Sequence, residues 1–297
     1  MAVMVMSRAR RILGLAIVLG CGLTVPSLGS TPADNQAASV SPAQLIREVV
    51  DAEVKATDAD HSHWMYRQHH VDPNKDIVQE CVQTKDGDIC RHLAEGGHTL
   101  NSAEQQQEQK RIHNLLDNPE QERKAQKARS HDGDEALQLL KMLPHAFRYT
   151  YDGEEGQCIR LKFEPNPNFE PPTHEARVFH AMMGTVLVDP KAKRLVELKG
   201  KLFKDVDFGW GLLGRLYQGG TFVVKRADVG GGHWDTTLLD VDIHGKALFF
   251  HTINAQQREV TTGYSKVSDN LTLAQGASML LGPTQSGKTA AAASGGN

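Results

Sequence analysis

Residues 184–204 read GTVLVDPKAKRLVELKGKLFK, which is two extended segments joined by a tight turn. Polar and apolar side chains alternate along Leu195-Val196-Glu197-Leu198-Lys199, as in a strand with one wet face. The intervening Asp189-Pro190-Lys191 is turn chemistry. Successive strands joined by tight turns pair as an antiparallel meander. This stretch therefore predicts an antiparallel sheet.

The same pattern continues on both sides. Predicted strands cover residues 62–70, 76–84, 88–94, 146–151, 157–164, 221–227, 234–243, 246–252 and 258–264. Asp152-Gly153, Gly230-Gly231-Gly232 and His244-Gly245 are the predicted turns between several of them.

Helices are predicted between these strands. Ser41 before Pro42 is a cap followed by a proline at the first helical position, so a helix should run to about Thr57. Asn101 and Glu104 are spaced as a capping pair for a polar helix over 102–127, which Asn118-Pro119 should break or kink. Further helices are expected at 133–143 and 173–182.

The first 29 residues have the composition of a cleavable signal peptide. Arg8, Arg10 and Arg11 precede an apolar run over 12–25, and small residues end the segment at Gly29. A flexible leader over 30–40 follows. We therefore expect a periplasmic or secreted protein. In the alternative, Cys21 lies in a lipoprotein box, and a lipid there would tether the chain to a membrane.

Charge and cysteines limit the function classes. The whole chain has a formal net charge of −3, and the signal segment holds three arginines and no acid, so the remainder is more acidic. Such a chain lacks the basic stripe that is typical of a protein that binds nucleic acid, so no nucleic-acid partner is expected. Export favours disulfides, and Cys81 and Cys90 flank a turn signal. With Asp86-Gly87 as the turn, the two cysteines are predicted to be diagonal neighbours that can form a disulfide.

Three motifs suggest chemistry that we do not assign. Residues 282–289 match the phosphate-binding loop pattern, but that loop needs a buried strand before it and a helix after it. No nucleotide is expected. His61, His63, His69 and His70 could form an adventitious metal site, although exposed strand and loop residues are the simpler interpretation. Asp205 and Asp207 lie on one strand face, as a cation site or a solvated strand end; no metal is assigned.

Four stretches give the chain a family resemblance. They are Leu137-x-x-Leu140-x-x-Leu143-Pro144-x-Ala146-Phe147-Arg148-Tyr149, Leu161-x-Phe163-x-Pro165, Gly184-x-Val186-x-Val188-Asp189 and Asp205-Val206-Asp207-Phe208-Gly209-Trp210-Gly211-Leu212-Leu213. With a leading helix and the aromatic pair Trp64 and Tyr66, they resemble the lipoprotein-carrier fold of LolA, LolB and RseB, and most nearly uncharacterised exported proteins of acidobacterial type.

The resemblance implies an α+β fold in which a curved antiparallel sheet forms an incomplete β-barrel, with helices covering its concave face. We predict a single such domain over 41–269, a polar helical insertion over 101–130 and a disordered tail over 270–297. In the carriers the hollow holds acyl chains.

We therefore expect a non-enzymatic envelope protein, without a cofactor, that binds a lipid or another apolar ligand. The expected ligand-binding residues are Trp64, Phe208, Trp210, Leu212 and Leu213. The alternative is a structural or regulatory module that binds another envelope protein and fills its hollow with its own side chains.

Overall fold

The computed structural model describes residues 40–118, 135–173, 175–208, 214–247 and 251–282. They form two compact units. Unit 1 takes the described residues of 1–60, 132–223 and 243–254, and unit 2 takes those of 61–131, 224–242 and 255–297. Among the described residues, no helix is both long enough and apolar enough to cross a membrane.

The strands form an open antiparallel sheet of 13 strands, which confirms the α+β class. The strands are β1 (His63–Asp72), β2 (Lys75–Thr84), β3 (Gly87–Glu95), β4 (His98–Thr99), β5 (Phe147–Glu155), β6 (Cys158–Pro165), β7 (Met182–Asp189), β8 (Arg194–Leu202), β9 (Val206–Phe208), β10 (Gly214–Leu216), β11 (Thr221–Asp228), β12 (Trp234–Ala247) and β13 (His251–Val267). Their order is β4-β3-β2-β1-β13-β12-β11-β8-β7-β6-β5, with β10 pairing β12 and β9. Strands β11, β12 and β13 contribute to both units.

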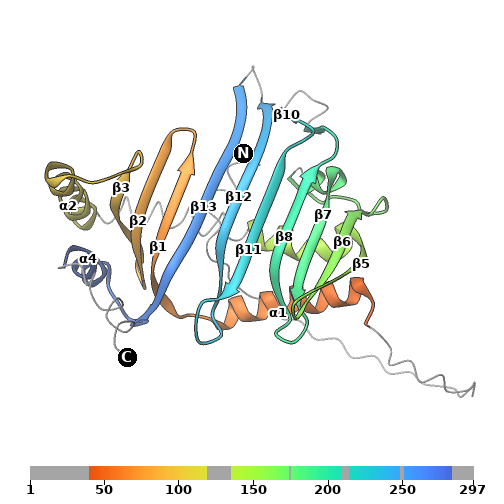
Figure 1. Ribbon diagram of the computed structural model, residues 1–297, viewed down its shortest axis with the longest axis horizontal. Coiled ribbons are helices and arrows are strands. Elements are labelled where there is room, and N and C mark those ends of the chain that lie inside the picture. The colour runs from red at the N-terminus through yellow and green to blue at the C-terminus, as the bar shows by residue number, and fades with distance from the viewer. Residues whose placement is uncertain (1–39, 119–134, 174, 209–213, 248–250, 283–297) are drawn as a thin grey trace, which may run out of the picture. The chain divides into compact units, whose positions relative to one another are not determined.

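In unit 1, helix α1 (Pro42–Ala59) packs on one face of β6, β7 and β8 (Figure 1). The Ser41 side chain caps the helix by accepting a hydrogen bond from the Gln44 N–H, and Pro42 stands in the first turn, as predicted. Apolar residues at helical spacing fill the interface. The buried cluster is Leu45, Ile46, Val49, Val50, Leu161, Val186, Val188 and Leu195.

Unit 1 also has a short helical segment that packs against the end strand β5. The 3-10 helix η2 (Glu175–Ala181) follows the proline-rich bend, close to the predicted helix over 173–182. Phe179 of η2 contacts Phe147 of β5, with ring centroids 5.3 Å apart. Residues 135–146 are also helical, which agrees with the helix expected at 133–143.

In unit 2, α2 (Ser102–Asp117) and α4 (Leu273–Leu281) lie beside β2 and β3 (Figure 1). Asn101 and Glu104 form the predicted capping box, and α2 ends one residue before Asn118. Polar residues dominate α2, and its buried apolar contribution is Ile112. The buried cluster of unit 2 is Val82, Ile89, Ile112, Ala277 and Leu280.

Two predicted turns are not turns. The backbone of β5 continues through Asp152-Gly153, which form a bulge opposite β6, and the chain reverses at residues 156–157 instead. His244-Gly245 lies inside the continuous strand β12. A Cβ atom at Gly245 would stand 2.3 Å from the Arg215 carbonyl oxygen, so glycine is needed there for the close approach of β10 rather than for a reversal.

The predicted disordered tail over 270–297 is wrong for its first part. Leu273–Leu281 form α4, capped by Thr272 and Gln275 in a second capping box. Leu280 and Ala277 are buried, so this helix is held by apolar packing that its alanine- and serine-rich surroundings concealed. Residues 283–297 lie outside the described part. The residues predicted as a single domain, 41–269, contribute to both units.

Candidate functional site

The predicted ligand-binding residues do not form one described site. Trp64 is in unit 2, where its ring is 6% exposed and stacks on His233 with ring centroids 4.8 Å apart. Its indole Nε1–H donates to the Ser62 hydroxyl at 2.7 Å, so both its polar group and its ring face are already engaged. Phe208 ends β9 in unit 1, and its side chain is outside the described part, as are Trp210, Leu212 and Leu213.

Unit 1 has a pocket of about 390 Å³. The last of its lining residues, Asp207, directly precedes Phe208 in the sequence. Its charged lining comes from η2 and from the segment that leads into β9. The lining residues are Pro171, Arg177, His180, Ala181, Lys204, Asp205, Val206 and Asp207.

The two acids of this pocket are held by a single arginine. The Arg215 Nε donates to Asp207 at 2.6 Å, and its Nη1 lies 3.6 Å from Asp205. Asp205 also accepts a hydrogen bond from the Gln218 N–H at 2.8 Å. The pair that sequence suggested as a cation site or a solvated strand end is therefore partly compensated by one guanidinium from β10.

Histidines of β1, β3 and β4 pair with carboxylates. The pairs are His63 with Asp269, His69 with Asp76, His70 with Asp72 and Glu259, His92 with Glu95, and His98 with Glu104. The interaction with Glu259 raises the pKa of His70 above its ordinary value, against the opposing effect of burial. Within the described residues, no group of three or more histidines, cysteines and acids is arranged to hold a metal ion.

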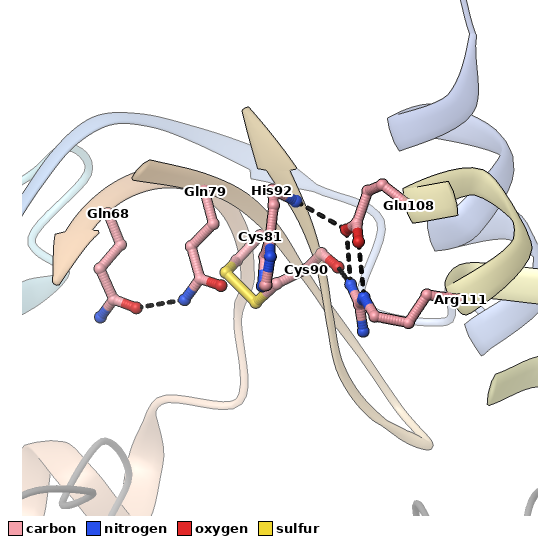
Figure 2. The surroundings of a disulfide bond; sticks show 7 residues. All are labelled: Gln68, Gln79, Cys81, Cys90, His92, Glu108 and Arg111. Atoms are coloured by element: carbon pink, nitrogen blue, oxygen red, sulfur yellow. Dashed lines mark hydrogen bonds and ion pairs between the residues drawn. A yellow bond between two sulfur atoms is a disulfide. The ribbon is translucent and has the colours of Figure 1, made fainter. Parts of the chain in front are cut away.

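Cys81 and Cys90 form the predicted disulfide, and Figure 2 shows its surroundings. The predicted diagonal arrangement is wrong. Thr84 pairs with Gly87, so Lys85 and Asp86 are the turn residues, and Cys81 lies directly opposite Cys90 with Cα atoms 4.0 Å apart. The turn stands one position earlier because Gly87 takes a φ of 133° at the first residue of β3, where the Thr84 hydroxyl bonds to its carbonyl.

Helix α2 contacts the same strand through two charged side chains (Figure 2). The Glu108 carboxylate accepts a hydrogen bond from the His92 N–H at 2.7 Å. The Arg111 guanidinium donates to the Cys90 carbonyl oxygen at 2.6 Å and to Glu108 at 2.6 and 2.7 Å. Both strand backbone groups therefore find a partner on a helix side chain instead of on a neighbouring strand.

Glu108 is buried, with 7% of its surface exposed, yet it stays ionised. Burial alone would raise the pKa of its carboxyl, but the hydrogen bonds from Arg111 and from the His92 N–H outweigh burial and lower the pKa. Sequence reasoning missed this pair because α2 reads as a solvated helix. Glu108 and Arg111, three residues apart and next to Ile112, were the available signal.

Removing the disulfide should destabilise the protein measurably. The cysteines are nine residues apart, and in the chain-entropy model closing so short a loop stabilises the folded state by roughly 2–3 kcal/mol. We expect the Cys81→Ser, Cys90→Ser double variant to lose about this much in urea unfolding. Addition of a thiol reductant should bring the wild type to the same stability. A double variant as stable as the oxidised wild type would contradict the assignment.

The contribution of Glu108 should depend on pH. Its folded-state pKa lies below the ordinary value of 4.5, so its stabilising effect is present above that value and disappears as the pH falls through the folded-state pKa. We expect Glu108→Gln to cost about 2 kcal/mol at pH 7, the scale of hydrogen bonds to a charged group. The difference from wild type should shrink below about pH 4. A difference that stays constant from pH 3 to pH 7 in urea unfolding would refute the ionised pair.

The phosphate-loop pattern at 282–289 follows a helix. Gly282 is the C-cap of α4, so the residues before the pattern are not the buried strand that such a loop requires. Its other residues lie outside the described part, and the absence of nucleotide binding stays a prediction. Comparison with known proteins finds no matching family model, no matching curated protein and no matching solved structure.

Proposed function

We propose that this chain is an exported, non-enzymatic interaction module of the cell envelope that binds another protein. The observation that carries the proposal is the packing of α1 on β6, β7 and β8. Leu161 and Val188 are 0% exposed beneath it, and Ile46 and Val49 of the helix are 3% and 2% exposed. A sheet face filled by the chain's own side chains leaves no room there for an acyl chain.

The finer fold belongs to the same proposal. The sheet would have the incomplete-barrel curvature of the lipoprotein carriers, with helices over its concave side and the hollow filled from within. A self-filled hollow supports a regulatory or structural role over ligand transport. A carrier needs a cavity that its ligand can enter and leave, and a hollow packed with side chains offers none.

Export is supported by the disulfide. The bond between Cys81 and Cys90 is compatible with an oxidising compartment, where such bonds persist. The signal peptide over 1–29 and the alternative lipid at Cys21 lie outside the described residues and remain predictions.

Binding of an amphiphilic lipid is the second candidate, and the pocket beside β9 favours it. Arg177 and Lys204 line that pocket, and the apolar residues Phe208, Trp210, Leu212 and Leu213 follow it in the chain. An anionic headgroup could meet the two cations of this pocket. A fluorescent fatty acid that binds the wild type and not an Arg177→Ala, Lys204→Ala variant would favour this second function.

Chemical cross-linking in intact envelopes tests the main proposal. The exposed Lys75 and Lys110 are on unit 2, and Lys191 and Lys201 are on unit 1. We expect lysines of one of these groups to cross-link to a single envelope protein at constant stoichiometry. If the protein cross-links only to itself or to no protein, and it binds the fluorescent fatty acid, the result would favour lipid binding over the interaction module.

A further inference from the structure

One histidine of unit 2 lies between two carboxylates. His70 is on β1, and its Nε2 is 2.9 Å from Oδ2 of Asp72. Its Nδ1 is 3.6 Å from Oε2 of Glu259 on β13, which is an ion-pair distance. A neutral imidazole carries a proton on only one of its two nitrogens, whereas an imidazolium carries one on each. Only the protonated ring therefore presents an N–H toward both acids.

The backbone places these three side chains together. Side chains two residues apart on a strand share a face, so His70 and Asp72 lie on the same face of β1. His70 and Glu259 are directly opposite each other in the antiparallel pairing of β1 with β13. The side chains of His70, Asp72 and Glu259 are 19%, 25% and 11% exposed. Salt therefore screens their interaction less than it screens a pair of fully exposed charges.

The other neighbours of this ring are uncharged or interact elsewhere. On β2, the residue opposite His70 is Ile77. Beyond it on β3, Glu95 pairs with a histidine of its own strand. Lys75 is opposite Asp72 and acts on that carboxylate. The residues two positions from Glu259 along β13, and two positions before His70 along β1, are uncharged. Asp72 and Glu259 are therefore the charges that decide the protonation of His70.

Loss of the proton changes the joint between β1 and β13. In the neutral ring, one nitrogen turns a lone pair toward a carboxylate, and the nearly buried Glu259 loses the positive charge opposite it. Glu259 raises the pKa of His70 above its ordinary value of 6.5. The stabilising effect of the pair is therefore complete below pH 6.5 and disappears as the pH rises through the folded-state pKa.

We propose that His70, Asp72 and Glu259 form a proton-dependent clasp, which holds β1 to β13 while both ring nitrogens of His70 are protonated and loosens when one proton is lost. The clasp goes beyond the proposed function, because it does not depend on what the protein binds. The exported location proposed above would expose it to the pH outside the cytoplasm. Unit 2 would then be held more tightly in acidic than in alkaline surroundings.

A histidine titration by NMR tests the clasp on the full mature chain. With isotope-labelled histidine, the resonance that is missing from the His70→Gln variant identifies His70. We expect His70 to titrate with a midpoint above pH 6.5, and Glu259→Gln to lower that midpoint. A His70 midpoint at or below pH 6.5 would overturn the proposal, as would a midpoint that Glu259→Gln does not lower.

The neighbouring histidine provides the matched control. His69 pairs with Asp76 at 2.8 Å, but both side chains are exposed, and ion pairs at the surface contribute little. His69→Gln should therefore leave the midpoint of His70 unchanged. If the Glu259→Gln variant does not fold, Asp72→Asn takes its place, and it should lower the same midpoint. A folded Asp72→Asn protein with the wild-type midpoint would then contradict the clasp.

Hydrogen exchange measures the loosening separately. The protection of the amides of β1 and β13, corrected for the intrinsic effect of pH on exchange, should fall as the pH rises through the midpoint of His70. His70→Gln should show no such fall, whereas His69→Gln should keep it. Wild-type protection that stays constant across the titration would show that His70 changes its charge without holding the strands, and would overturn the proposal. Neither measurement depends on the envelope cross-links that test the proposed function.

Discussion

Replacing Glu53 with alanine should lower the free energy of unfolding by about 3–5 kcal/mol, the scale for breaking a buried ion pair from one side. Glu53 is 1% exposed within α1. Its carboxylate accepts a hydrogen bond from the Leu195 N–H at 2.9 Å and lies 3.1 Å from the Arg194 guanidinium. The alanine variant leaves a backbone donor and a nearly buried arginine without this partner, and both changes cost free energy.

A matched control is available on the same helix. Glu48 pairs with Lys193 at 2.7 Å, but this pair is at the surface, where ion pairs contribute little. Glu48→Ala should therefore change stability far less than Glu53→Ala in urea unfolding. Glu53→Gln, which keeps an acceptor of the same size, should fall between the two. Equal losses for Glu48→Ala and Glu53→Ala would show that Glu53 is not a buried anchor.

The second large effect is expected at Gly184, where β7 meets β8. Gly184 pairs with Gly200, and a Cβ atom built on Gly184 stands 2.0 Å from the Lys199 carbonyl oxygen and 2.6 Å from the Gly200 Cα. These neighbours are backbone atoms, so no side chain can rotate away. We expect Gly184→Ala to cost about 3 kcal/mol, at the upper end of overpacking effects.

The neighbouring residue provides the comparison for this effect. Thr185→Ala removes atoms from the same strand without adding any, and it should cost less than about 1 kcal/mol. Thermal unfolding followed by circular dichroism measures both variants. A Gly184→Ala protein as stable as Thr185→Ala would mean that β7 and β8 are further apart than described.

The local features of the fold could be predicted because their causes are local. The cap at Ser41, the capping box of Asn101 and Glu104 and the end of α2 beside Asn118 depend on residues within one helical turn. Strand positions followed from alternation, and most boundaries moved by one or two residues.

The turn predictions failed at two glycines whose role depends on contact with another strand and not on the residues beside them in the sequence. Gly245 permits the approach of β10, and the residues around Gly153 form a bulge, yet both read as turns beside a polar residue. The one-position error at Asp86-Gly87 changed the cysteines from opposite to diagonal. A register error of one residue alters every cross-strand neighbour, so local turn propensity cannot settle such contacts.

The anchoring acids were also missed, although each left a trace. Glu53 follows Val49 and Val50 at helical spacing, so an acid stands on the apolar face of α1 and needs a buried partner. Glu108 stands four residues before Ile112 on α2. Their partners, the N–H groups of Leu195 and His92, belong to strands that only the folded chain brings near.

Native mass spectrometry of the mature protein, purified from its own envelope and followed by lipid extraction, tests the central claim most directly. If the hollow of the sheet is filled by the chain's own side chains, as we propose, the protein should have the mass of the polypeptide, alone or with a protein partner, and yield no stoichiometric lipid. A bound species of lipid mass that a fluorescent fatty acid displaces would contradict the self-filled fold and restore the carrier function.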